Sequence, residues 1–105
     1  EKAIYTPGAA FLNVLSPCPR GWGYEPSEMM NICKLAVETC YWPLFEVVDG
    51  KWILSYAPKK KLPLEDFLRP QRRFKHLFKP GNEELLVAFQ AEVDKRWEEL
   101  QNKCQ

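Results

Sequence analysis

Apolar and polar residues are grouped in blocks along this chain, and each block predicts one element of structure. Residues 9–15 form an almost unbroken apolar run of strand-forming side chains, too short for a helix. Such a run is typical of a strand covered on both faces, as in a parallel sheet. A stretch rich in Pro, Cys and Gly follows directly. We therefore predict a strand and loop over residues 9–23 that present Cys18 just beyond the carboxyl end of the strand, where open α/β sheets gather their ligands.

The next block has apolar residues at helical spacing. Pro26 suits the first turn of a helix, where its missing N–H is no loss. The helix must end near Trp42, because a residue before proline, here Pro43, is pushed out of the α region. The pattern thus predicts a helix over residues 26–41. Its predicted buried stripe, which includes two cysteines as small core residues, is Met29, Cys33, Ala36, Val37 and Cys40.

Two strand-like runs then flank Asp49-Gly50, a dipeptide suited to a type I′ turn. This pattern predicts a β-hairpin over residues 44–56.

The remainder, residues 64–103, is predicted to be helical. A short helical turn at 64–68 and a second short helix at 71–78 precede a long final helix with Asn82 at its N-cap. The side chains predicted to face the core are Phe74, Leu77, Phe78, Leu86, Phe89, Val93, Trp97 and Leu100. On the exposed side, Glu92 with Arg96 and Glu99 with Lys103 are favourable pairs.

These elements do not make a complete sheet. A strand covered on both faces needs parallel neighbours, and each neighbour needs its own crossover connection. The chain offers only one such strand, so folding alone would leave apolar surface uncovered. We therefore expect an α/β fold that is an incomplete piece: one parallel-type strand, a β-hairpin and three to four helices, with the other strands on further polypeptide. The start without Met fits a chain cut from something longer.

The composition of the chain argues against several classes of function. The formal net charge of +1 gives no field that would attract nucleic acid or a membrane surface. The chain has no apolar run of the roughly 20 residues that a membrane span needs, and its first residues lack signal-peptide features. Of the four cysteines, Cys33 and Cys40 would lie roughly 10 Å apart along one helix, too far for a disulfide. No CxxC pair is present. We therefore expect a reducing compartment, the cytoplasm.

Three features of the sequence allow more than one interpretation. The basic run Lys59–Lys61 is either a solvated connector or a contact for an acidic partner or phosphate. The single histidine, His76, is either a surface helix residue or a base or ligand. Cys18 itself is an inert loop thiol, a nucleophile or a metal ligand. The neighbouring prolines stiffen the loop and favour a fixed thiolate direction, but one cysteine cannot hold a metal cluster alone.

Several segments together carry a resemblance. Residues 16–22 read Ser-Pro-Cys-Pro-Arg-Gly-Trp, and further matches lie at residues 35–39, 42–46, 71–77 and 94–100. In this order they resemble the C-terminal third of the thiamine diphosphate-binding β subunit of 2-oxoacid:ferredoxin oxidoreductases of the pyruvate synthase type. The resemblance covers essentially the whole chain.

The resemblance implies a reaction and a set of cofactors. Such enzymes carry out coenzyme A-dependent oxidative decarboxylation of a 2-oxo acid and pass electrons through a [4Fe–4S] cluster to ferredoxin. Cys18 matches the late cysteine that supplies one ligand of the thiamine-proximal cluster. The family's CxxC pair and its Gly-Asp-Gly…Asn motif for Mg²⁺ and thiamine diphosphate are absent here. Those cofactors would be bound by the rest of the β subunit, and we expect no catalytic residue and no activity in this chain alone.

Two other functions remain as alternatives. One is a non-catalytic interaction domain that binds an acidic partner through its basic residues, which are Lys59–Lys61, Arg69, Arg72, Arg73 and Lys75. The other is an enzyme that uses the Cys18 thiol.

Overall fold

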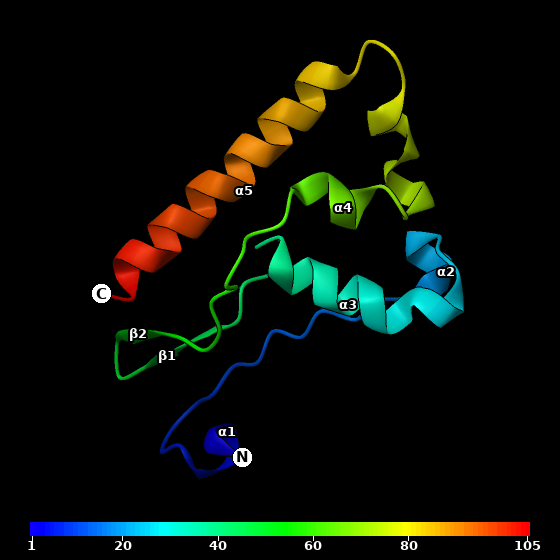
Figure 1. Ribbon diagram of the computed structural model, residues 1–105. Helices are drawn as coiled ribbons and strands as arrows, with labels where there is room; N and C mark the ends of the chain where they lie inside the picture. The colour runs from blue at the N-terminus through cyan, green and yellow to red at the C-terminus, as the bar shows by residue number, and fades with distance from the viewer.

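Short helices and one two-stranded sheet make up the computed structural model, which describes all residues 1–105 (Figure 1). The helices are α1 (Lys2–Tyr5), α2 (Pro19–Trp22), α3 (Met29–Glu38), α4 (Leu64–Leu68) and α5 (Glu83–Lys103), with 3₁₀ helices η1 (Pro26–Glu28) and η2 (Arg72–Phe78). The strands are β1 (Phe45–Val48) and β2 (Lys51–Leu54). The expected mixture of helices and a hairpin is present, together with two short helices, α1 and α2, that the sequence pattern did not indicate. No helix is both long and apolar enough to cross a membrane.

The core lies where α3, α4, η2 and α5 meet. Phe67 of α4 is fully buried at its centre, with its ring 5.9 Å from the Trp22 ring and 4.6 Å from the Tyr41 ring, measured between centroids. The buried apolar residues that form one cluster are Trp22, Tyr24, Ile32, Ala36, Cys40, Leu64, Phe67, Leu68, Leu77 and Val93. The helices that the sequence predicted in the C-terminal part therefore supply much of the core.

Helix α3 differs from the predicted helix in its end and in its buried face. It ends at Glu38, and Cys40 lies beyond it with φ 64° in the left-handed region. The buried side chains of α3 are Ile32 and Ala36, whereas Met29 is exposed and Cys33 is half-buried. The predicted stripe is confirmed at Ala36 and Cys40, which are buried, but it included the exposed Met29 and omitted Ile32, whose side chain is fully buried in the core.

The hairpin confirms the prediction for residues 44–56. Val48 pairs with Lys51 and Phe45 with Leu54 in antiparallel register. Asp49 at φ 51° and Gly50 at φ 76° both occupy the left-handed region, as a type I′ turn requires. The rings of Phe45 and Trp52 stack across the two strands with centroids 5.4 Å apart.

The predicted C-terminal helices are also confirmed, with two local differences. The segment 72–78 is a 3₁₀ helix, and Leu77 is its buried residue. Asn82 stands at the N-cap of α5, but its side chain donates a hydrogen bond to the His76 carbonyl (2.6 Å) and does not cap the helix. At the exposed face, Glu92 and Arg96 form the predicted ion pair at 2.9 Å.

The predicted strand at residues 9–15 is absent from the structure. This segment runs extended below α3 without secondary structure (Figure 1), and Phe11, Leu12 and Val14 are 74–87% exposed. The prediction was wrong for this chain by itself: the only strands present, β1 and β2, pair with each other, and residues 9–15 pair with neither.

The accessible surface and the radius of gyration show that the chain is less compact than a typical domain of its length. The accessible surface is 7978 Å², whereas a monomeric domain of this mass exposes about 6,100 Å². The radius of gyration is 15.9 Å, against about 13 Å for a compact domain of this length. The expectation that apolar surface stays uncovered is therefore confirmed.

Candidate functional site

Cys18 occupies the N-cap of helix α2. Its backbone is extended (φ −81°, ψ 115°), and Pro19 follows as the first helical residue. Because proline has no N–H, the first free donor of the turn lies further along. The thiol sulfur accepts a hydrogen bond from the Gly21 N–H, with N and Sγ 3.5 Å apart.

This geometry favours the ionised form of the thiol. Hydrogen bonds from the Gly21 and Arg20 backbone lower the pKa of Cys18 below its ordinary value, and the Arg20 charge acts in the same direction, while desolvation opposes them. The side chain is exposed to solvent. A thiolate, and not a thiol, is the form that binds metals and attacks electrophiles. Cys18 thus presents a solvent-exposed thiol whose pKa is lowered by its place at the start of α2.

The Cys18 loop, residues 17–24, is fixed by its own hydrogen bonds. The Trp22 N–H donates to the Cys18 carbonyl at 2.9 Å, and the Gly23 N–H donates to the Pro19 carbonyl at 2.9 Å. The Tyr24 hydroxyl donates to the Pro17 carbonyl at 2.8 Å and closes the loop from the other side.

Helix η2 contacts the end of the Cys18 loop. The Arg72 N–H donates to the Gly23 carbonyl at 2.8 Å. Gly23 has φ 76°, and a Cβ placed on it would lie 2.8 Å from the Arg72 Cβ. Only glycine satisfies both the left-handed backbone and this close approach. This role of Gly23 was not predicted from the sequence; its position directly after Trp22, at the end of a short turn, was the available signal.

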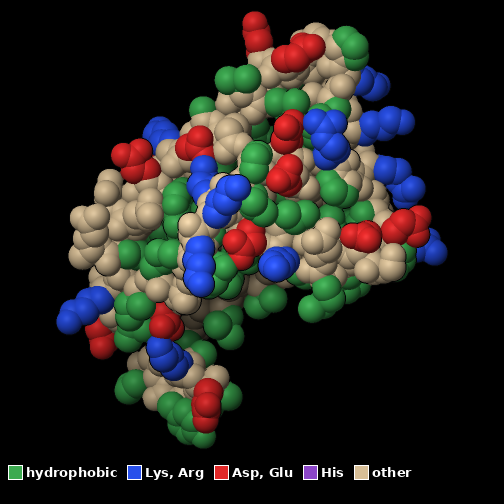
Figure 2. Space-filling model, viewed as in Figure 1, with side chains coloured by type: hydrophobic (Ala, Val, Ile, Leu, Met, Phe, Trp, Pro, Cys, Tyr) green, Lys and Arg blue, Asp and Glu red, His purple; other side chains and the backbone are tan.

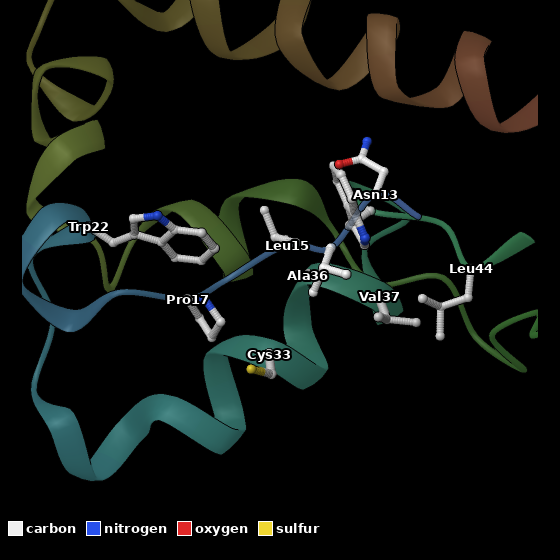
Figure 3. A pocket seen from close by; sticks show the side chains of 10 residues that line it. Asn13, Leu15, Pro17, Trp22, Cys33, Ala36, Val37 and Leu44 are labelled. Carbon is white, nitrogen blue, oxygen red and sulfur yellow. The ribbon is translucent and has the colours of Figure 1, made fainter. Parts of the chain in front are cut away.

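An apolar cavity of about 280 Å³ lies beside the loop (Figure 3). Leu15 and Pro17 line it from the extended segment, and Cys33, Ala36 and Val37 line it from α3. No charged residue lines this cavity. It therefore provides packing surface and no group for acid–base chemistry.

The cysteines do not form a metal centre among themselves. All four are free thiols, and no group of three or more Cys, His, Asp or Glu side chains is arranged to hold a metal ion. Cys40 is buried, which raises the pKa of its thiol, and Cys33 faces the apolar cavity. The donor chemistry fits Cys18 as one ligand of a soft metal or cluster, with every other ligand from outside this chain.

A thiol enzyme would need a base next to Cys18. The side chain of His76 is exposed and makes no hydrogen bond, so the structure supplies no Cys–His hydrogen bond.

Three of the basic residues of the alternative interaction surface have partners within the chain. Lys61 pairs with Asp94, and Arg69 pairs with Glu65 at 3.1 Å. Arg73 is packed on the Trp22 ring. Arg69, Arg72 and Lys75 line one shallow hollow, and Figure 2 shows Lys and Arg side chains gathered along the upper right edge of the molecule. The structure therefore brings part of this basic surface together and pairs the rest within the chain.

Comparison with known proteins gives relatives along nearly the whole chain, although no protein-family model matches. Pyruvate synthase subunit PorB of Thermotoga maritima is 44% identical over 101 residues, which are 95% of this chain and 31% of that protein. PorB of Methanosarcina barkeri is 42% identical over 90% of this chain and 32% of its own length. Ketoisovalerate oxidoreductase subunit VorB of Pyrococcus horikoshii is 40% identical over 95% of this chain and 32% of its own length.

The chain thus spans about one third of the length of these relatives. The resemblance read from the sequence is confirmed: the chain is similar, over about one third of their length, to subunits of a pyruvate synthase and of a ketoisovalerate oxidoreductase.

Proposed function

We propose that this chain supplies one ligand, the Cys18 thiolate, to a [4Fe–4S] cluster in a 2-oxoacid:ferredoxin oxidoreductase. The observation that carries the proposal is the Cys18 loop, an exposed thiol held by backbone N–H groups at the N-cap of α2. It lies in a chain with 44% identity to a pyruvate synthase subunit. When bound, such a cluster transfers single electrons.

The residues of this chain would act by holding that ligand. Hydrogen bonds from backbone N–H groups to a ligating sulfur stabilise its negative charge and tune the reduction potential of a cluster. The Gly21 N–H already makes this bond. The three remaining ligands, thiamine diphosphate and Mg²⁺ would be bound by the rest of the subunit.

The uncovered surface indicates where that remaining polypeptide packs. The accessible area of 7978 Å² exceeds that expected for a compact domain by about 1,900 Å², more than the roughly 800 Å² that each partner contributes to a standard protein interface. Phe11, Leu12 and Val14 are exposed, and Val14 and Leu15 line the apolar cavity. We place the chain as the C-terminal third of the subunit, with residues 9–15 packed against the remaining polypeptide.

The substrate is assigned as a class. Relatives named for pyruvate and for ketoisovalerate match at 42–44% and 40% identity, and both acids carry a 2-oxo group. We therefore propose oxidative decarboxylation of a 2-oxo acid with coenzyme A as acyl acceptor and ferredoxin as electron acceptor. Thiolate ligands persist in a reducing compartment, so we assign the complex to the cytoplasm.

Replacement of Cys18 in the assembled oxidoreductase tests the proposal. Cys18→Ser should lower the iron content by about one cluster per subunit, or alter the EPR spectrum of that cluster, because an alkoxide is a poor substitute for a thiolate. Cys104→Ser, at the far end of α5, is the matched control and should change neither. An unchanged iron-to-protein ratio and EPR spectrum in the Cys18 variant would refute the assignment.

A further inference from the structure

The side chain of Arg73 lies behind the Cys18 loop. Its guanidinium carbon is 4.0 Å from the centroid of the Trp22 ring and 4.5 Å from that of the Phe74 ring. Its Nε donates a hydrogen bond to Gln71 Oε1 at 2.7 Å. Arg72 and Lys75, on the same 3₁₀ helix, are exposed. Arg73 therefore packs inward and contacts the last residue of α2.

This placement has an energetic cost. Arg73 Nη2 is buried without a hydrogen-bond partner, and burial lowers the pKa of the guanidinium. A buried charge is unfavourable unless other contacts offset it. The faces of the two aromatic rings provide such contacts, and a cation–π interaction strengthens as water is excluded. Arg73, which is half-buried and forms no ion pair, is therefore held at this place by the two rings and by Gln71.

A continuous set of contacts links Arg73 to the centre of the core. Gln71, fully buried, donates from Nε2 to the Phe67 carbonyl at 2.6 Å. Phe67 meets the Trp22 ring edge-to-face at 5.9 Å. Trp22 thus contacts Phe67 of α4 and Arg73 of η2.

Trp22 in turn determines the shape of the Cys18 turn. Its N–H closes the turn on the Cys18 carbonyl at 2.9 Å, and Gly21, the donor to the sulfur, directly precedes it. The contacts of the Trp22 ring therefore act on the backbone directly beside the Gly21 donor.

We infer that Arg73 is a positioning residue, which braces Trp22 and thereby fixes the direction of the Cys18 sulfur. This inference rests on the proposed role of Cys18 as a cluster ligand. Lysine would keep the charge at position 73 but would lose the planar group that stacks on Trp22.

The experiment compares Arg73→Lys with Arg72→Lys in the assembled oxidoreductase. The control is the adjacent residue, keeps its charge and has an exposed side chain. Hydrogen exchange of the Trp22, Gly23 and Tyr24 amides measures the closure of the loop, and an EPR-monitored redox titration measures the cluster potential. Arg73→Lys should accelerate exchange of these amides about tenfold and shift the potential, while α5 amides stay unchanged. Arg72→Lys should do neither.

A second variant serves if Arg73→Lys does not assemble. Trp22→Phe keeps an aromatic ring against Phe67 but gives Arg73 a weaker face, so exchange should accelerate about threefold. The inference is overturned if Arg73→Lys shows the same loop exchange rates as the Arg72→Lys control. Where Arg73→Lys does not assemble, Trp22→Phe is compared with that control in the same way. Equal acceleration of exchange in the loop and in α5 would also overturn it. The Cys18→Ser measurement tests the proposed function separately, and loop exchange reports on bracing whatever metal is bound.

Discussion

Gly23 is the position where the structure predicts the largest effect from the smallest substitution. Alanine there would adopt φ 76° and place its Cβ 2.8 Å from the Arg72 Cβ. The left-handed backbone costs an alanine about 1–2 kcal/mol. The overlap adds about 1–3 kcal/mol, because a Cβ bound to the η2 backbone cannot rotate away as a flexible chain end can. Together these predict a local destabilisation of about 2–5 kcal/mol for Gly23→Ala.

The matched control is Gly50→Ala in the hairpin turn. Gly50 has the same φ of 76°, and a Cβ added there would meet no atom within 4 Å. Its cost is therefore the backbone strain alone, about 1–2 kcal/mol. The difference between the two variants isolates the contact between the Cys18 loop and η2.

Native-state hydrogen exchange in the assembled protein measures both costs. The Arg72 amide, which donates to the Gly23 carbonyl, should exchange about 30-fold to 4,000-fold faster in Gly23→Ala. Hairpin amides in Gly50→Ala should accelerate about 5-fold to 30-fold. Equal factors in the two variants would show that a Cβ at position 23 finds room, and the seating of the loop against η2 would then be wrong.

Two further predictions concern the contacts of α5. Gln90 Oε1 accepts from the Leu64 N–H at 2.8 Å and satisfies a donor in the first turn of α4. Gln90→Ala should therefore cost about 1–2 kcal/mol and accelerate exchange of the Leu64 amide. Gln90→Glu keeps the acceptor but replaces the Nε2 donor to Asp94 (2.8 Å) with a second carboxylate, so it should restore protection of the Leu64 amide only in part. The Lys61 ammonium lowers the pKa of Asp94, so the pair stabilises the fold above the ordinary carboxyl pKa and loses this effect as pH falls through the lowered value. The melting temperature of wild type should exceed that of Asp94→Asn slightly at pH 6, and the gap should narrow as the pH falls below the ordinary carboxyl pKa; a constant gap would show that the ion pair contributes nothing.

Elements that depend on nearby residues were the ones that the sequence could predict. Asp49-Gly50 specifies its turn through two backbone conformations, and the hairpin follows from that turn alone. The position of Cys18 beyond an extended segment was also predictable, because Pro17 and Pro19 restrict the backbone on both sides.

Features that depend on distant contacts were not predictable. The phase of α3 is set by Ile32 against the core, and the positive φ of Cys40 results from the chain reversal that follows. Arg73 was grouped with the exposed basic residues because the sequence does not show that Trp22, 51 residues earlier, lies against it. Residues 9–15 have the composition of a strand, but a strand forms only where hydrogen-bonding partners exist.

The two halves of the segment around Cys18 therefore differ in what they need in order to form. The loop is closed by hydrogen bonds within residues 17–24 and by η2, all inside this chain. The preceding residues 9–15 leave their backbone groups and the Phe11 side chain open to solvent. The hydrogen bonds that close the loop therefore involve none of residues 9–15, and the contacts of Gly23 with Arg72 and of Trp22 with Arg73 also lie within this chain. For the proposed cluster it follows that the direction of the Cys18 sulfur depends on contacts that this chain makes by itself.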